Sequence, residues 1–163
     1  MIVVSDTGPI RYLLVIGAES LLPSLFGEIL LPTAVLVELR HPNAPQAVRD
    51  WAATLPHWAV KRSPAGPIPD LNADPGETEA IALAKELNGA LLTDDEQAAR
   101  IARAEGIPAF GTLGVLQRGH ARSLIDIAES LEALGRTNYR HTPALFQRVI
   151  RQAEEMRRSM PNG

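Results

Sequence analysis

The stretch VVSDTGPI, residues 3 to 10, sets the pattern for the whole chain. An apolar run, Ile2–Val4, ends abruptly in Asp6, and Pro9 follows three residues later. A run of β-branched residues is typical of a strand buried in a parallel sheet. Proline is favoured in the first turn of a helix, because its missing N–H is no loss there. The stretch therefore predicts a short buried strand, a carboxylate at its end, and a helix over Ile10–Ile16.

The same unit, a short apolar strand followed by a helix, recurs along the chain. This alternation predicts an α/β fold, a three-layer α/β/α sandwich with a central parallel sheet, followed by C-terminal helices. In such sheets ligands bind beyond the C-terminal ends of the strands. Further strands are expected at 28–32, 58–61, 90–93 and 107–110, and further helices at 19–26, 33–40, 44–54, 77–87, 96–105, 113–119, 124–134 and 143–158.

Composition limits the classes of protein that fit. A chain of 163 residues with 45% hydrophobic residues suits one globular domain. The chain has no cysteine, which excludes disulfides and thiolate zinc sites and fits a cytoplasmic protein. We see neither a signal peptide nor an apolar run near the roughly 20 residues of a membrane helix, so no membrane partner is expected.

Charge divides the chain into two parts. Residues 1–135 hold 10 basic and 17 acidic residues, a net charge of −7, whereas residues 136–163 hold 6 arginines and 2 glutamates, a net of +4. We therefore predict a main domain over 1–135 and a basic helical extension over 136–163 that packs on or beside it.

Acidic residues at strand ends and on the following helices are the candidates for function, and each has a competing structural role. Asp6 ends the first strand and would also suit a helix cap. Glu38 lies between apolar neighbours on the helix 33–40, where it would otherwise be a solvated residue paired with Arg40. Asp94 and Asp95 end the strand 90–93; one of them can cap the next helix, and we expect Asp95 to be the free one.

Two glutamates in DPGETEAIALA, residues 74–84, carry different expectations. Asp74 followed by Glu77, with Pro75 between them, is a capping pattern, so helix initiation explains Glu77. Glu79 lies on a helix with little polar surface. A buried carboxylate needs a partner such as an arginine or a metal ion, so Glu79 is the stronger candidate.

Taken together, these acids predict a metal site. The ends of parallel strands meet at one edge of a sheet, and several carboxylates held there repel one another unless cations lie between them. Oxygen ligands without cysteine or clustered histidine favour Mg²⁺ or Mn²⁺ over zinc. The histidines at 41, 57, 120 and 141 we interpret as ordinary surface or turn residues.

The combined motifs resemble the PIN domain family. The similarity rests on VVSDTGPI, VELR at 37–40, GETEAIALA at 76–84 and LLTDDEQAAR at 91–100, and it covers nearly all of residues 1–125. GTLGVLQRG at 111–119 is similar to a subgroup related to the VapC toxins of toxin–antitoxin pairs.

The resemblance implies a Rossmann-like domain that is a metal-dependent endoribonuclease, with an RNA substrate, a possible antitoxin partner and a homodimeric assembly. By motif position its metal-binding and catalytic acids map onto Asp6, Glu38, Glu79 and Asp95, with Asp94 as an alternative ligand. Family members often carry aspartate where Glu79 stands.

Substrate contacts and two other functions complete the sequence-based hypotheses. Thr7, Arg11 and Arg100 are candidates to contact RNA, although Arg100 would also suit an ion pair with Glu96. A PIN fold without useful cleavage, acting as an RNA-binding or antitoxin-binding module, is the alternative. A phosphatase or phospho-acceptor domain is less consistent with the sequence, because DTGP has no second acid and Lys85 lies inside a predicted helix.

Overall fold

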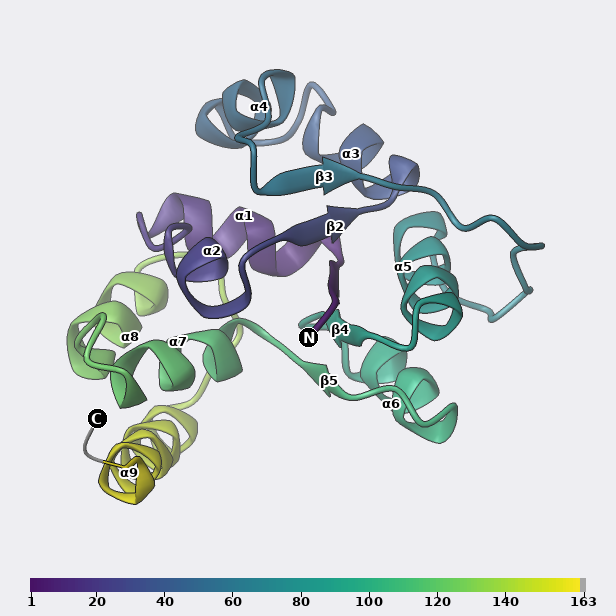
Figure 1. Cartoon of the computed structure of the whole chain (residues 1–163). Helices are drawn as coiled ribbons and strands as arrows, with labels where there is room; N and C mark the ends of the chain where they lie inside the picture. The colour runs from purple at the N-terminus through teal and green to yellow at the C-terminus, as the bar shows by residue number, and fades with distance from the viewer. Residues whose placement is uncertain (162–163) are drawn as a thin grey trace.

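A computed structural model describes residues 1–161 and places a five-stranded parallel sheet at the centre of the molecule (Figure 1). The strand order is β3-β2-β1-β4-β5, and every neighbouring pair is parallel. The predicted α/β fold is therefore confirmed. The strands are β1 Val3–Ser5, β2 Ile29–Leu31, β3 Ala59–Lys61, β4 Ala90–Leu92 and β5 Ala109–Phe110.

Helices cover both faces of the sheet (Figure 1), because successive residues of each strand point to opposite faces and both sets are apolar. Val3 belongs to a core cluster with residues of α1, α2, α3, α4, α7, α8 and α9, whereas Val4 belongs to a second cluster with residues of α5 and α6. The helices are α1 Thr7–Val15, α2 Leu21–Phe26, α3 Thr33–Leu39, α4 Gln46–Ala53, α5 Pro75–Glu86, α6 Glu96–Ala104, α7 Thr112–Ala121, α8 Ile127–Gly135 and α9 Pro143–Ser159.

Helix α1 begins three residues before the predicted start at Ile10. Asp6 is the N-cap, and its side chain accepts a hydrogen bond from the Thr7 N–H. Pro9 is the third residue of the helix, still in the first turn, where its missing N–H breaks no helical bond. The strand thus passes into the helix with Asp6 as the only residue between them, which fixes this carboxylate at the sheet edge.

Helix α9 packs on α7 and α8 and buries Val149 and Ala153 in the core. His120 on α7 is buried at 4% exposure; its Nε2 bonds Glu154 Oε1 at 2.6 Å, and its Nδ1 accepts the Ile127 N–H at 3.2 Å. Our interpretation of His120 as a surface residue is therefore wrong, because it joins three helices.

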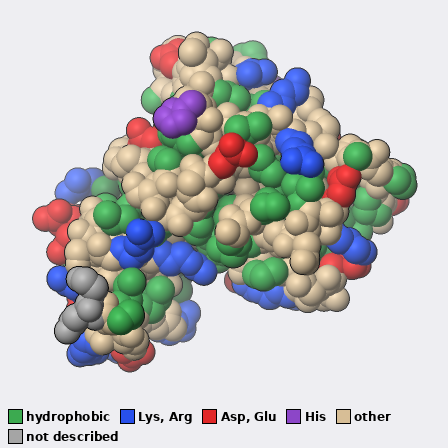
Figure 2. Space-filling model, in the orientation of Figure 1, with side chains coloured by type: hydrophobic (Ala, Val, Ile, Leu, Met, Phe, Trp, Pro, Cys, Tyr) green, Lys and Arg blue, Asp and Glu red, His purple; other side chains and the backbone are tan. Residues whose placement is uncertain are grey.

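The α9 lobe stands apart from α6 across a notch edged by basic side chains (Figure 2). Beside it, a hollow of about 320 Å³ is lined by apolar side chains of α2 and α9 together with Arg118 and Arg122. None of the helices formed by the described residues has both the length and the apolar character that a membrane span requires.

Candidate active site

The candidate site lies where the strand order reverses. β1 has β2 on one side and β4 on the other, and the Asp6 N–H donates to Leu92 O at 2.8 Å, so both strands end at the same level. Ligands of open α/β sheets bind at such a switch point, beyond the carboxyl ends of the strands. Asp6 after β1 and the Thr93–Asp95 turn after β4 meet there.

Asp6 is the most buried acid of this edge, at 7% exposure. Its Oδ1 accepts the Thr7 N–H at 2.8 Å, and its Oδ2 accepts the Thr93 hydroxyl at 3.0 Å. Burial raises the pKa of Asp6 to about 6; these two hydrogen bonds oppose the increase, and the charges of Asp74 and Glu38 add to it. Asp6 is therefore a precisely held carboxylate with no basic partner among its hydrogen bonds.

Glu38 points from α3 toward the same edge. The Thr7 hydroxyl donates to its Oε2 at 2.6 Å, and its Oε1 lies against Gly76 at the start of α5. The predicted alternative, a solvated glutamate paired with Arg40, does not form, since Arg40 Nε donates to Ala52 O at 3.0 Å instead. Thr7 thus orients Glu38 while its backbone holds Asp6.

Glu77 joins this group of acids. Asp74 and Glu77 form the predicted capping box: Asp74 Oδ1 accepts the Glu77 N–H at 2.8 Å, and Glu77 Oε2 accepts the Asp74 N–H at 3.3 Å. Burial raises the pKa of Glu77 to about 7, and the charges of Asp74, Asp6 and Asp95 contribute further to the increase. Glu77 therefore lies among the acids of the sheet edge as well as capping its helix.

Glu79 points elsewhere. Its Oε1 accepts the Ala34 N–H at 3.2 Å, so it caps the first turn of α3. Residues two apart on a helix do not face the same side, since each residue turns about 100°. Glu79 has found a partner, as a half-buried carboxylate must, but the partner is a helix N-terminus, and the structure does not bring Glu79 together with Asp6.

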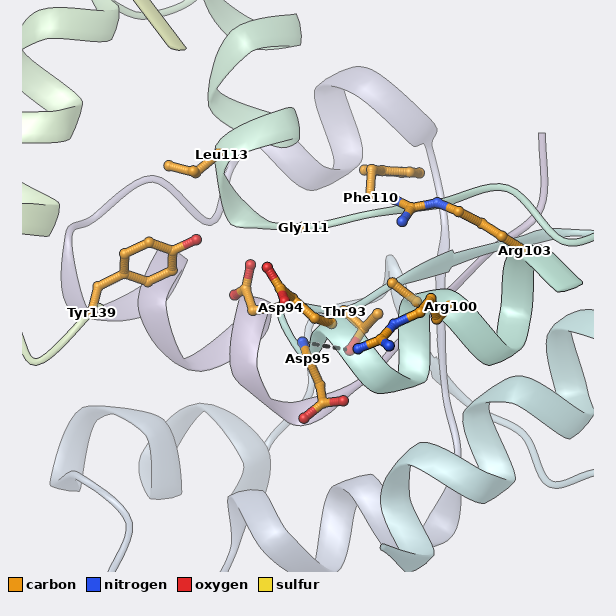
Figure 3. Close-up of a pocket in the computed structure, with 11 residues that line it drawn as sticks. Thr93, Asp94, Asp95, Arg100, Arg103, Phe110, Gly111, Leu113 and Tyr139 are labelled. Carbon is orange, nitrogen blue, oxygen red and sulfur yellow. Dashed lines mark hydrogen bonds between the residues drawn. The ribbon is translucent and has the colours of Figure 1, made fainter. Parts of the chain in front are cut away.

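The two aspartates after β4 have roles opposite to those expected (Figure 3). Asp95, predicted to be free, is the N-cap of α6 and accepts the Ala98 N–H at 2.8 Å. Asp94, predicted to cap that helix, instead accepts the N–H and the hydroxyl of Thr112 at 2.8 and 2.6 Å. The reason is that Gly111, the N-cap of α7, has no side chain, so Asp94 caps α7 from another segment.

Asp94 is fully engaged in this structural role. Tyr139 also donates a hydrogen bond to it, and Gly111 passes so close that a β-carbon there would overlap the carboxylate. Burial raises the pKa of Asp94, and the hydrogen bonds from Thr112 and Tyr139 oppose the increase. Asp94 is therefore less available to a metal ion than its neighbour Asp95, whose side chain is exposed.

We call the acids that act on one another at this edge the acidic site: Asp6, Glu38, Asp74, Glu77 and Asp95. Among residues 1–161, no three His, Cys, Asp or Glu side chains are already close enough to hold a common ion. The donors nevertheless fit a hard cation, because all are oxygens. The pKa values of Asp6 and Glu77 are raised, mainly by burial and in part by the charges of neighbouring acids of the site. A divalent cation would offset that repulsion.

The three residues predicted to contact RNA, Thr7, Arg11 and Arg100, differ in their contacts with the acidic site. Thr7 contacts Glu38 directly. Arg11 is half-buried on α1 and makes no hydrogen bond or ion pair within the described part of the chain, and neither does Arg100, which is exposed on α6 beside Asp95. The expected Glu96–Arg100 ion pair is thus not formed.

Carboxylates gathered at the switch point of a parallel sheet define a class of domain suited to metal-assisted phosphoryl transfer. A family model described as a PIN domain matches residues 2–155. The chain belongs to the PIN domain family, whose members are generally nucleases that use divalent metal ions. Searches of curated proteins and of solved structures gave no match.

Sequence reasoning missed Glu77, although a signal for it was present. The first turn of a helix that follows a strand of a parallel sheet lies close to the carboxyl edge of that sheet. Glu77 is in the first turn of α5, whereas Glu79 is closer to the middle of the helix. The position of each glutamate along the helix therefore indicated better which one lies at the site than its capping role did.

The raised pKa values predict an unusual pH dependence of stability. With divalent cations removed by EDTA, folded Asp6 and Glu77 keep protons that the unfolded chain releases near its ordinary pKa values of 3.8 and 4.5. Their stabilisation is complete below pH about 4 and is lost as the pH rises through about 6 and about 7. Thermal unfolding followed by circular dichroism should show that the Tm of the unaltered protein falls between pH about 4 and about 7, relative to the Tm of the double variant Asp6→Asn/Glu77→Gln. Parallel Tm curves for the two proteins would contradict the assignment.

Gly76→Ala tests the approach of Glu38 to α5. A β-carbon at Gly76 would lie 2.5 Å from Glu38 Oε1, and the flexible carboxylate would move rather than the backbone. If the acidic site cleaves nucleic acid, we expect its cleavage rate to fall roughly 10- to 100-fold, as misplacement near a reacting centre does, with less than about 1 kcal/mol lost in stability. Gly66→Ala is the control, since a β-carbon there meets nothing within 4 Å. Equal activity of both variants would place Glu38 outside the chemistry.

Proposed function

We propose that this PIN domain is a metal-dependent endoribonuclease that hydrolyses phosphodiester bonds of RNA, with Mg²⁺ or Mn²⁺ held by Asp6, Glu38, Glu77 and Asp95. One observation carries the proposal: Asp6 is buried, has no basic partner, and is surrounded by acids from three other segments. In this proposal Glu77 is a metal ligand in place of Glu79, which was predicted from the sequence. Asp74 lies beside this set and adds to its negative charge.

Each acid would enter the reaction already positioned. The Thr7 N–H and the Thr93 hydroxyl hold Asp6, the Thr7 hydroxyl holds Glu38, and the Ala98 N–H holds Asp95. A divalent cation bound there would supply Lewis acidity and would lower the pKa of a water molecule bound to it. Arg11 and Arg100 lie on the helices that follow Asp6 and Asp95, where their guanidinium groups suit phosphate oxygens.

The basic extension is proposed to assist RNA binding. Residues 136–163 carry a net charge of +4, and the arginines of α9 are exposed. Such a surface attracts the RNA backbone without reading its sequence. In this proposal the nuclease domain is residues 1–135, and the extension lies against it through α7 and α8.

A toxin role in a toxin–antitoxin pair is proposed from the similarity of GTLGVLQRG to the VapC-related subgroup. Residues of that motif form most of α7, which holds α9 in place. An antitoxin protein and a second copy of the chain are the proposed protein partners. Purification of the chain with the product of a neighbouring gene would test the pairing.

A cleavage assay separates this proposal from the binding-module alternative. Purified protein should cleave single-stranded RNA with Mg²⁺ or Mn²⁺ and lose the activity in EDTA, with recovery on adding Mn²⁺. Isothermal titration should detect Mn²⁺ binding. RNA binding without metal-dependent cleavage would favour the binding module instead. Glutamate at position 79, where family members often carry aspartate, does not favour the binding module, because its side chain caps α3.

A further inference from the structure

A pocket of about 440 Å³ opens next to the acidic site, between α6 and α7 (Figure 3). Asp95 is among the residues that line it, so the pocket and the acidic site share this residue. The volume falls in the range of pockets that hold small organic ligands. We call it the α6–α7 pocket and define it by Arg100, Arg103, Phe110, Leu113 and Tyr139.

The side chains of the α6–α7 pocket fall into two chemical groups. Arg100 and Arg103 come from one side, three residues apart and therefore on one face of α6, while Leu113 and Tyr139 lie on the opposite side (Figure 3). Arg103 is oriented by its bond to Ala109 O at 2.8 Å, and Arg100 makes no contact of this kind in the described chain. The pocket thus combines two guanidinium groups with apolar and aromatic surface, and Asp94, Asp95 and Glu96 also line it.

The three acids that line the pocket leave the two guanidinium groups unpaired: Asp95 caps α6, Glu96 is exposed to solvent, and neither forms an ion pair with Arg100 or Arg103 in the described chain. Asp94 lines the pocket, but its oxygens accept hydrogen bonds from Thr112 and Tyr139 and are turned toward α7. Tyr139 is itself held, since its ring packs edge-on against Tyr12 with ring centres 5.0 Å apart. The Tyr139 wall is therefore preformed.

We propose that the α6–α7 pocket binds one unpaired nucleotide of the RNA next to the scissile phosphate, with its phosphate on Arg100 and Arg103 and its base against Leu113 and Tyr139. The inference rests on the proposed ribonuclease function. Guanidinium groups match phosphate oxygens, and aromatic surfaces stack bases of single strands. A base paired inside a helix cannot reach such a pocket, so the nucleotide bound there must be unpaired.

Binding can be measured apart from cleavage in the Asp6→Asn background. The probe is a fluorescein-labelled single-stranded RNA of mixed sequence, followed by anisotropy. Arg100→Gln/Arg103→Gln should weaken binding at least tenfold. The slope of log affinity against log salt should fall by about 0.7, the value for one phosphate contact on a single strand. Lys61→Gln/Arg62→Gln, the same loss of two charges at the end of β3, on the opposite edge of the sheet from β5, should weaken binding less than threefold.

Three results would overturn the pocket: equal weakening by both double variants, unchanged affinity of the α6 variant, or duplex RNA competing as well as the single strand. Arg103 also bonds the β5 backbone, so Arg100→Gln alone is measured too, and it should weaken binding about threefold to fivefold.

Cleavage by the otherwise unaltered protein separates this inference from the proposed function. If RNA binding depends on Arg100 but no metal-dependent cleavage occurs, the nuclease proposal fails and the pocket stands. If metal-dependent cleavage occurs and RNA affinity does not depend on Arg100 and Arg103, the nuclease proposal stands and the pocket proposal fails. An acidic peptide that binds through the two arginines while RNA affinity is unchanged would also overturn the inference.

Discussion

Asp6→Asn is expected to reduce metal-dependent RNA cleavage by about 10³-fold or more, while the protein stays folded. A metal ion contributes several kcal/mol to stabilising a phosphoryl-transfer transition state, and each 1.4 kcal/mol is a factor of ten in rate. Asparagine keeps an oxygen that can accept the Thr7 N–H, and asparagine is as good a helix N-cap as aspartate. The substitution therefore removes a charge from the acidic site and leaves the start of α1 intact.

Without metal, the same substitution is expected to leave Tm unchanged or to raise it. Burial disfavours the ionised form of Asp6, so the neutral amide relieves a cost that the charged carboxylate imposes at neutral pH. The measurements are Tm in EDTA and initial cleavage rates in Mg²⁺ and Mn²⁺. Undiminished cleavage by Asp6→Asn would refute the assignment of the site.

Asp126→Asn is the matched control. Asp126 is the N-cap of α8, accepts the Glu129 N–H at 3.0 Å, and lies outside the acidic site. The control makes the same chemical change at the same kind of helix position. Cleavage by Asp126→Asn should stay within about twofold of the unaltered protein, since surface substitutions usually change stability by less than about 0.5 kcal/mol.

Glu77→Gln and Glu79→Gln are expected to behave very differently, although the residues are two positions apart. Glu77→Gln should reduce cleavage by about 100-fold or more, because it removes one of the charges that a cation would bind. Glutamine can still accept the Asp74 N–H, so α5 should keep its capping box. Glu79→Gln should keep cleavage within about threefold, since its carboxylate caps α3.

In EDTA, Glu77→Gln and Glu79→Gln are expected to change the stability of the protein in opposite directions. Glu77→Gln should stabilise the protein at pH 8, because the pKa of Glu77 is raised in the folded state. Glu79→Gln should destabilise it by less than about 1 kcal/mol, the scale of a weakened helix cap. Loss of cleavage in Glu79→Gln with activity retained in Glu77→Gln would restore the assignment made from the sequence.

The fold was predictable because every strand is short, apolar and followed by a helix-start signal. Both faces of the sheet are covered, so strands such as Ile29–Leu31 are continuously apolar and easy to recognise. Helix starts were less accurate: Ile10 was expected to begin α1, but the helix begins at Thr7 because Asp6 serves as its cap.

The sequence predicted Asp6 and Glu38 as members of the candidate site, but it did not predict Glu77 or the capping role of Asp95. One physical reason accounts for both differences. Sequence reasoning treated capping and site membership as exclusive roles, and so set Glu77 aside and expected Asp95 to be free. In the structure Asp6, Glu77 and Asp95 all bond the first turn of a helix and also lie in the acidic site. The role of Asp94 depends on Gly111, which is distant in sequence, so no local pattern could reveal it.

Three helices, α1, α5 and α6, have their first turns capped by Asp6, by Asp74 with Glu77, and by Asp95. Their peptide dipoles therefore place partial positive charge, roughly half a unit per helix, next to these acids. This permanent counter-field lets the carboxylates stay together before any cation arrives. The protein can accordingly fold without an ion, and an ion bound afterwards would add to the stability of a fold that already exists.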